Sequence, residues 1–301
     1  MNLFNKVGLM AALAAMRLCV AADDGAYSMP IVDEFVKDAR VAYALPEYAA
    51  YTNTLLRTGK YRNRGTDSGL PKRDAWAPGR VRWIDVGGVR NVRDIGGWTG
   101  LRTGMVFRGG ELDSDRVRKP DPRNPDKKAA SYGRITPAGL TTLREGLRIR
   151  TDLDLRKDFG LPSGLGADVK HVVIPISAYT NMLKGTERVA ACLRVFADPE
   201  NYPVYVHCAG GADRTGSILF LLEGLCGVPE PDLNIEYELT TFGLAERSRM
   251  DKPYYFASLV KRMKTCPGAN LNEQIVWYVE HELGLAKDEI AAIRRSLMPV
   301  R

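Results

Sequence analysis

The chain has 301 residues, of which 45% are hydrophobic and 26% are charged. This composition is ordinary for a soluble globular protein, and it excludes a collagen-like, coiled-coil or largely disordered chain. The formal net charge of +7 fits an anionic ligand, but the sequence contains no recognisable nucleic-acid-binding module, so we expect no nucleic-acid partner.

The first 22 residues resemble an export signal. Lys6 supplies a short basic region, residues 7–15 are apolar and rich in small side chains, and residues 20–22 (Val-Ala-Ala) fit a cleavage site. The apolar run is too short to span a bilayer, so we expect no stable membrane span. The sequence therefore predicts an exported protein, periplasmic or secreted.

Residues 23–80 are expected to form an N-terminal extension. Apolar residues at helical spacing between Val32 and Ala39 predict one short helix, and residues 57–80, rich in Arg, Lys and Gly, predict a loop. The main domain is expected to cover residues 81–301. A charged, proline-containing insert at residues 113–134 is expected to be a surface loop within it.

Strand and helix patterns alternate from residue 81 onward. The predicted strands lie at residues 81–86, 105–107, 149–155, 171–176 and 204–206. One helix is predicted to begin at Thr136, and four more are predicted at residues 186–196, 215–226, 271–283 and about 290–297. This order predicts an α/β sandwich with a mostly parallel central sheet flanked by helices. Such sheets bind ligands beyond the carboxyl ends of their strands.

The four cysteines beyond the export signal are scattered. They form no C-x-x-C pair and have no metal-like spacing, so we expect neither a disulfide framework nor a metal site. Cys192 and Cys226 lie in apolar helical patterns and are predicted to be small core residues. Cys208 is different, because it directly follows the predicted strand at 204–206.

The segment from His207 to Gly216 carries the clearest chemical signal. Its glycines let the chain curl so that successive backbone N–H groups point inward, and the following helix adds its N-terminus. These features together predict a site for a dianionic phosphate. The residues expected to bind that phosphate are Ala209, Gly210, Gly211, Ala212, Asp213 and Arg214.

The same loop contains the groups needed for covalent catalysis. A thiol at its base has a lowered pKa, so the thiolate of Cys208 is the expected nucleophile. Arg214 is expected to hold two phosphate oxygens, Asp213 to protonate the leaving group, and Thr215 to stabilise the sulfur. His207 is expected to brace the loop rather than to move protons. No cofactor is expected.

This loop resembles the HCxxGKDRTG loop of the bacterial tyrosine/lipid phosphatases in the protein-tyrosine-phosphatase superfamily. Other segments resemble further motifs of that family in the same order: residues 91–97 (NVRDIGG), 107–112 (FRGGEL), 154–156 (DLR) and 236–240 (EYELT). The resemblance covers about residues 81–298. It implies a protein-tyrosine-phosphatase-like fold and hydrolysis of phosphomonoesters through a phosphocysteine intermediate.

Four charged residues in these upstream motifs are expected to support the site: Arg93, Asp94, Asp154 and Arg156. Two interpretations of them stay open. They either form ion pairs that shape the wall of the site, or they contact the substrate directly.

One position departs from the family pattern. The resembling enzymes often have a lysine, associated with multiply phosphorylated substrates, where this chain has Ala212. We therefore expect a phosphorylated protein or small phosphomonoester as substrate, with phosphotyrosine first and phosphoserine, phosphothreonine and phosphoinositides as further candidates. One alternative is an exported inositol-polyphosphate phosphatase, which the charge and the export signal favour. The other is an inactive phosphate-binding module, against which the intact Cys208, Asp213 and Arg214 argue.

Overall fold

The computed structural model describes residues 84, 86–96, 99–113, 134–238, 240 and 253–299. The predicted export signal and the N-terminal extension lie outside these residues, as does the predicted surface loop between its two ends. Those ends, Asp113 and Arg134, form an isolated antiparallel bridge. None of the described helices is long and apolar enough to cross a membrane.

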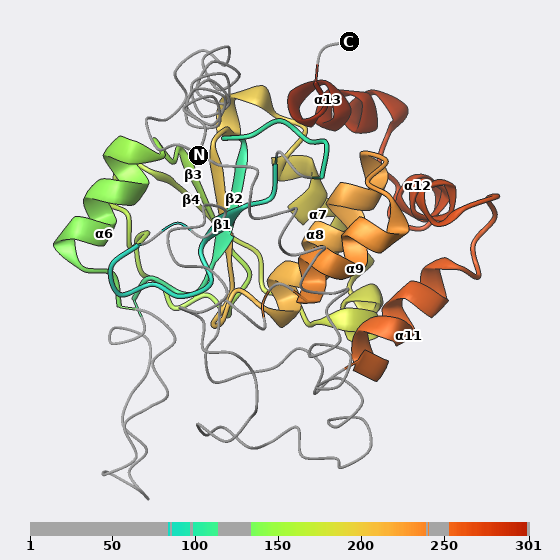
Figure 1. Ribbon diagram of the computed structural model, residues 1–301, viewed down its shortest axis with the longest axis horizontal. Coiled ribbons are helices and arrows are strands. Elements are labelled where there is room, and N and C mark those ends of the chain that lie inside the picture. The colour runs from blue at the N-terminus through green and yellow to red at the C-terminus, as the bar shows by residue number, and fades with distance from the viewer. Residues whose placement is uncertain are drawn as a thin grey trace, which may run out of the picture.

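A five-stranded sheet forms the centre of the described chain (Figure 1). Its strands are β1 (Arg93–Asp94), β2 (Val106–Gly109), β3 (Thr151–Asp154), β4 (Lys170–Val173) and β5 (Val204–His207). Their order in the sheet is β1-β2-β5-β3-β4, and only β1 runs antiparallel to its neighbour. The predicted α/β fold with a mostly parallel sheet is therefore confirmed. Because β5 is the central strand, Cys208 leaves the sheet at its middle.

The described residues also form seven α-helices. They are α6 (Pro137–Thr141), α7 (Thr186–Val195), α8 (Asp213–Leu225), α9 (Glu230–Glu238), α11 (Pro253–Met263), α12 (Leu271–His281) and α13 (Lys287–Leu297). A π-helical turn, Thr142–Gly146, continues α6, and two 3₁₀ turns cover Tyr179–Lys184 and Pro199–Asn201. The five helices predicted from Thr136 onward are all present, although α8 begins two residues earlier than expected, whereas the short helix predicted between Val32 and Ala39 lies outside the described residues.

The predicted helix start at Thr136 is confirmed, and α12 begins with a similar cap. Thr136 accepts a hydrogen bond from the backbone N–H of Gly139 at 3.1 Å, with Pro137 in the first turn. Asn270 accepts one from the backbone N–H of Glu273 at 3.0 Å. The predicted strand at 81–86 is wrong at its described end. There Val86 makes only an isolated bridge to Val89 across a Gly-Gly turn.

Apolar clusters cover both faces of the sheet. Successive strand residues point to opposite faces, so Val204 and Val206 join the cluster formed with α7, α8, α12 and α13. Tyr205 points the other way, toward Leu143 and Leu147 beyond the end of α6. Figure 1 shows α6 on one side of the sheet and the larger group of helices on the other. The strand before Cys208 is therefore held from both sides.

Helix α8 fixes the segment that follows Cys208. Every residue from Thr215 to Leu225 is buried, as the apolar sequence predicts. The helix packs against α7, α9 and α12, and a Cβ at Gly224 would lie 2.4 Å from the Cδ1 atom of Ile275 in α12. Burying each large aliphatic side chain contributes about 1.5–3 kcal/mol. The N-terminus of α8 is thus placed by the main core of the protein.

Candidate active site

A tight loop, residues 208–212, joins the end of β5 to the start of α8. Gly211 has a φ of +62°, in the left-handed region that favours glycine. A Cβ at this position would lie 2.1 Å from the carbonyl oxygen of Gly109 in the neighbouring strand β2. Both the backbone conformation and the available space therefore require glycine here.

The carbonyl groups of residues 209–211 are held by the rest of the protein. Asn91 donates to two of them at 3.2 and 2.9 Å, Arg108 donates to one at 2.6 Å, and the backbone N–H of Glu111 donates to another at 3.1 Å. The C=O and N–H of a trans peptide point in opposite directions. Fixing the carbonyls on the outside of the loop therefore turns the N–H groups toward its inside, as an anion site requires.

Cys208 lies at the base of this loop and is 3% exposed. Burial by itself would raise the pKa of its thiol. The positive charge of Arg214 and hydrogen bonding from the side chain and backbone N–H of Thr215 outweigh burial and the opposing charge of Asp213, so the pKa is lowered from its ordinary value. The thiolate is therefore favoured at a site prepared for an anion.

The first turn of α8 presents two further predicted residues. Arg214 is half-buried, and one terminal nitrogen of its guanidinium donates to the carbonyl oxygen of Leu155 at 3.2 Å. The carboxylate of Asp213 is hydrogen-bonded to the hydroxyl of Tyr179. The structure thus brings Cys208, Asp213, Arg214 and Thr215 to one point, whereas their chemical roles stay predictions.

His207 is buried beneath the loop. Its Nε2 atom lies 3.0 Å from Oδ1 of Asp152, and its Nδ1 atom lies 3.3 Å from the carbonyl oxygen of Cys208. Burial opposes the charged ring, but the carboxylates of Asp154 and Asp152 outweigh it and raise the pKa of His207 to about 9. Both ring nitrogens of His207 therefore have buried partners, while its role as a brace for the loop stays a prediction.

Asp154 and Arg156 form a buried ion-pair cluster between strand ends. The Arg156 guanidinium lies 2.7 Å from Asp154, 2.8 Å from Asp113 and 3.1 Å from Glu111. Burial opposes both charges. The ring of His207 and the pairing with Arg156 nevertheless lower the pKa of Asp154, and the carboxylates of Asp154 and Asp113 raise the pKa of Arg156. Two interpretations of this pair were open, ion pairing and substrate contact. The described contacts are those of ion pairs.

Arg93 and Asp94 also make internal contacts. Arg93 is fully buried and lies 2.9 Å from Glu236 of α9, which also pairs with Arg108 at 2.9 Å. Asp94 accepts hydrogen bonds from the backbone N–H groups of Gly96 and Gly104, at 2.7 and 2.6 Å. The charges of three buried arginines around the loop, Arg156 included, are therefore balanced by nearby carboxylates.

The sequence did not indicate several residues of this site. Asn91, Arg108 and Glu111 lie within family-like motifs, but their spacing along the chain does not reveal that they hold the loop carbonyls. Tyr179 lies in no such motif, and 34 residues separate it from Asp213. Only the fold brings these side chains to the loop.

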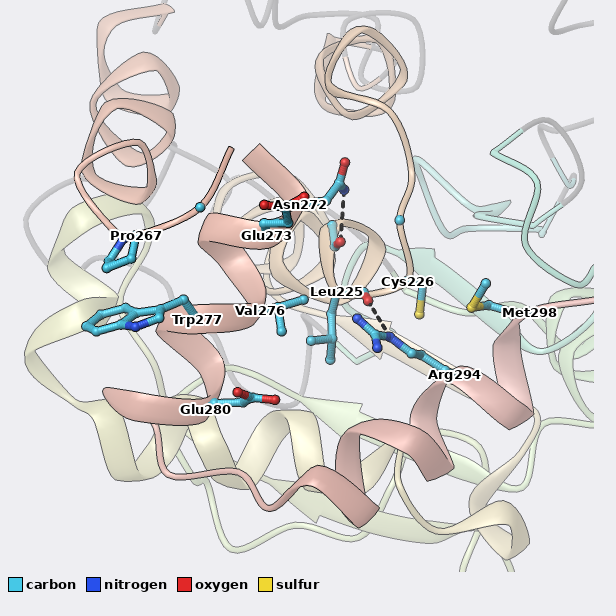
Figure 2. Close-up of a pocket in the computed structure, with 13 residues that line it drawn as sticks. Leu225, Cys226, Pro267, Asn272, Glu273, Val276, Trp277, Glu280, Arg294 and Met298 are labelled. Carbon is cyan, nitrogen blue, oxygen red and sulfur yellow. Dashed lines mark hydrogen bonds between the residues drawn. The ribbon is translucent and has the colours of Figure 1, made fainter. Parts of the chain in front are cut away.

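A cavity of about 650 Å³ lies away from this site (Figure 2). It is formed at the C-terminal end of α8 by residues that include Leu225, Val276, Trp277 and Arg294. Arg294 donates from Nε to the carbonyl oxygen of Leu225 at 2.9 Å, which satisfies one of the last carbonyls of the helix. The Cys208 loop is at the other end of this helix, roughly 20 Å away at 1.5 Å per residue. The cavity is therefore separate from the candidate active site.

Comparison with known proteins gives a match to the tyrosine phosphatase family over residues 84–299, a range that contains the whole candidate site. No curated protein sequence matches significantly. Among solved structures, the core catalytic domain of the PP-IP phosphatase SIW14 from S. cerevisiae, in complex with citrate, is 17% identical with a TM-score of 0.38. That alignment covers 60% of this chain and 94% of the other. The resemblance inferred from the sequence motifs is confirmed by the family match.

Proposed function

Because the chain belongs to the tyrosine phosphatase family and is a cysteine-type phosphoric monoester hydrolase, we propose that it acts through a phosphocysteine on Cys208 and prefers phosphotyrosine. One observation carries this proposal. A thiol with a lowered pKa lies at the base of a loop whose carbonyls are tied outward, beside Arg214 at a helix N-terminus.

In the first step, the thiolate of Cys208 attacks phosphorus in line with the ester oxygen. The sulfur–phosphorus bond forms as the phosphorus–oxygen bond breaks, and Asp213 gives a proton to the departing oxygen. The loop N–H groups and the planar fork of Arg214 bind the oxygens of the transferring phosphoryl group. Inorganic phosphate has not yet formed at this stage, and the enzyme carries the phosphoryl group on sulfur.

In the second step, water attacks the phosphocysteine. Asp213, now a carboxylate, takes a proton from that water as the sulfur–phosphorus bond breaks. The leaving group is the thiolate of Cys208, which the charge of Arg214 and the hydrogen bonding of Thr215 stabilise. Phosphate then leaves and the thiolate is ready for the next substrate.

The surroundings of the loop favour a substrate with a single phosphate. Arg93, Arg108 and Arg156 are paired with carboxylates, so they contribute little net positive field for a second phosphate. Ala212 is 1% exposed and adds no charge. Tyr255 of α11 is 41% exposed and stacks on Tyr179, which is hydrogen-bonded to Asp213, so an exposed ring is connected to the proposed acid through one side chain. An aromatic surface suits an aryl phosphate.

The test is a substrate panel with kcat/KM measured for phosphotyrosine peptides, phosphoserine peptides, phosphoinositides and inositol hexakisphosphate. We expect phosphotyrosine peptides to give the highest value. Faster hydrolysis of phosphoinositides or inositol hexakisphosphate would replace this proposal with the inositol-polyphosphate alternative. Binding of phosphate without turnover of any substrate would favour the inactive phosphate-binding module.

The acid role of Asp213 predicts a specific kinetic change. In Asp213→Asn, kcat/KM should fall by roughly 10²- to 10⁴-fold for phenyl phosphate, whose leaving group needs a proton. The loss should be much smaller for p-nitrophenyl phosphate, whose leaving group is stable as an anion. The measurement is kcat/KM across a series of aryl phosphates, with thermal unfolding as a check on the fold. Equal losses across the series would show that Asp213 is not the proton donor.

A further inference from the structure

Tyr179 has an unusual backbone conformation next to the site. It begins the 3₁₀ turn Tyr179–Lys184 with a φ of +55°, which is rare for a bulky aromatic residue. Its backbone N–H donates to Oγ of Ser217 at 2.8 Å, and the same hydroxyl donates to the carbonyl oxygen of Asp213 at 2.7 Å. The buried side chain of Ser217 therefore ties the backbone of Tyr179 to the first turn of α8.

The side chain of Tyr179 makes a second connection to the same turn. Its hydroxyl is hydrogen-bonded to Oδ1 of Asp213 and lies 3.0 Å from the hydroxyl of Tyr237. A tyrosine hydroxyl has one proton to donate, and an ionised carboxylate can only accept. When Asp213 is ionised, Tyr179 therefore donates to Asp213 and accepts from Tyr237.

Tyr237 is itself held firmly. Its side chain is 3% exposed, and its ring stacks on Phe256 of α11 with centroids 3.9 Å apart and planes 9° apart. The ring of Tyr179 meets it edge-on at 6.3 Å. The packed rings of Tyr237 and Phe256, which come from different parts of the chain, thus fix the hydroxyl oxygen of Tyr179 that contacts Asp213.

We propose that Tyr179 is a positioning residue for Asp213, holding one carboxyl oxygen so that the other is aimed at the leaving group. The terminal torsion of an aspartate is broad and has no strong preference of its own. Fixing Oδ1 from Tyr179 sets the plane of the carboxyl group, and misplacing a proton donor by a small distance lowers its contribution to the rate. This inference rests on the proposed acid role of Asp213, and it adds a residue on which that role depends.

The test removes the hydroxyl alone. In Tyr179→Phe we expect kcat/KM to fall roughly tenfold for phenyl phosphate, the scale of one hydrogen bond, and to change little for p-nitrophenyl phosphate. In the Asp213→Asn background, the same substitution should have little further effect, because a residue that acts through Asp213 has nothing left to position. Tyr237→Phe should change the leaving-group dependence in the same direction by a smaller factor.

Tyr202→Phe is the matched control, since it also removes a buried hydroxyl, one that donates to the carbonyl oxygen of Phe196 at 2.6 Å. We expect it to lower the melting temperature without changing the leaving-group dependence. Equal losses for both substrates in Tyr179→Phe, or losses that add fully to those of Asp213→Asn, would overturn the proposal. If the single variant Asp213→Asn loses kcat/KM equally for phenyl phosphate and p-nitrophenyl phosphate, Asp213 is not the acid, and this inference fails with that assignment. If Asp213→Asn shows unequal losses but Tyr179→Phe shows equal ones, this inference fails while the acid assignment stands.

Discussion

Replacing Cys208 with serine should reduce turnover of p-nitrophenyl phosphate to background, a loss on the order of 10⁶-fold, as when a covalent nucleophile is removed from a hydrolase. The charge of Arg214 and the hydrogen bonding of Thr215 lower the pKa of a thiol at this position. The same groups cannot ionise a serine hydroxyl near neutral pH, because its intrinsic acidity is far lower. Serine has the same branching as cysteine and a smaller γ atom, so the loop should keep its shape and still bind phosphate.

Selective alkylation provides an independent check on this nucleophile. Burial raises the pKa of both Cys192 and Cys226 to about 12, so these thiols stay protonated and unreactive at neutral pH. Iodoacetate should therefore label Cys208 before Cys192 and Cys226 and abolish activity in proportion to labelling, and phosphate should protect Cys208. Cys192→Ser is the matched control, which should lose stability but keep its activity. Turnover that persists in Cys208→Ser, or that a metal chelator removes from the unmodified protein, would contradict the thiolate mechanism.

The position of the Cys208 loop between a strand and a helix could be predicted because its sequence signals are local. A short apolar strand, two glycines, the Cys208-to-Arg214 spacing and an apolar helix all occur within about twenty consecutive residues. Each signal depends only on residues that are close in sequence. Glycine permits a left-handed turn, a helix N-terminus favours an anion, and the planar guanidinium of arginine can bind two phosphate oxygens. In the structure, the strand, the loop and the helix follow one another in the predicted order.

The contacts that hold the loop could not be predicted in the same way. Asn91 reaches Gly211 across 120 residues, and Arg93 reaches Glu236 across 143 residues. Sequence alternation at 149–155 indicated two opposite faces, but it did not show that both are buried. Asp152 pairs with Tyr205 of the central strand β5, and its carboxylate lies 3.0 Å from the ring of His207 two residues further along that strand. These partners are determined by strand order, which a single sequence does not reveal.

Helix α11 is a different case, because the sequence does carry the pattern of a helix there. Pro253 begins it, and Phe256, Leu259 and Met263 are buried at helical spacing. Helix α9 offered a weaker pattern, since its first turn is acidic and its apolar residues are few. Both helices matter to the site, as α9 supplies Glu236 to two arginines and α11 supplies the ring beneath Tyr237.

Substituting Arg214 should have the second largest effect, and two variants separate its two roles. Arg214→Ala removes both the planar fork and the charge, so kcat/KM should fall by roughly 10³- to 10⁵-fold, the range for arginines that stabilise phosphoryl-transfer transition states. Arg214→Lys keeps the charge but loses the two-point contact with phosphate oxygens, so kcat/KM should still fall by about 10²-fold or more. Activity measurements alone do not show whether a variant has lost the two-point contact with phosphate or has lost the thiolate form of Cys208.

The pH dependence of iodoacetate labelling makes that distinction. The positive charge of Arg214 is the main influence that lowers the pKa of Cys208 against the opposing effect of burial. Removing the charge in Arg214→Ala should therefore raise that pKa, so the midpoint of labelling moves to higher pH and labelling below neutral pH slows. Arg214→Lys should keep a midpoint near that of the unmodified protein while losing phosphate affinity. If the labelling curves of Arg214→Ala and the unmodified protein coincide, the thiolate is stabilised by Thr215 and the loop N–H groups, and Arg214 serves only the phosphate.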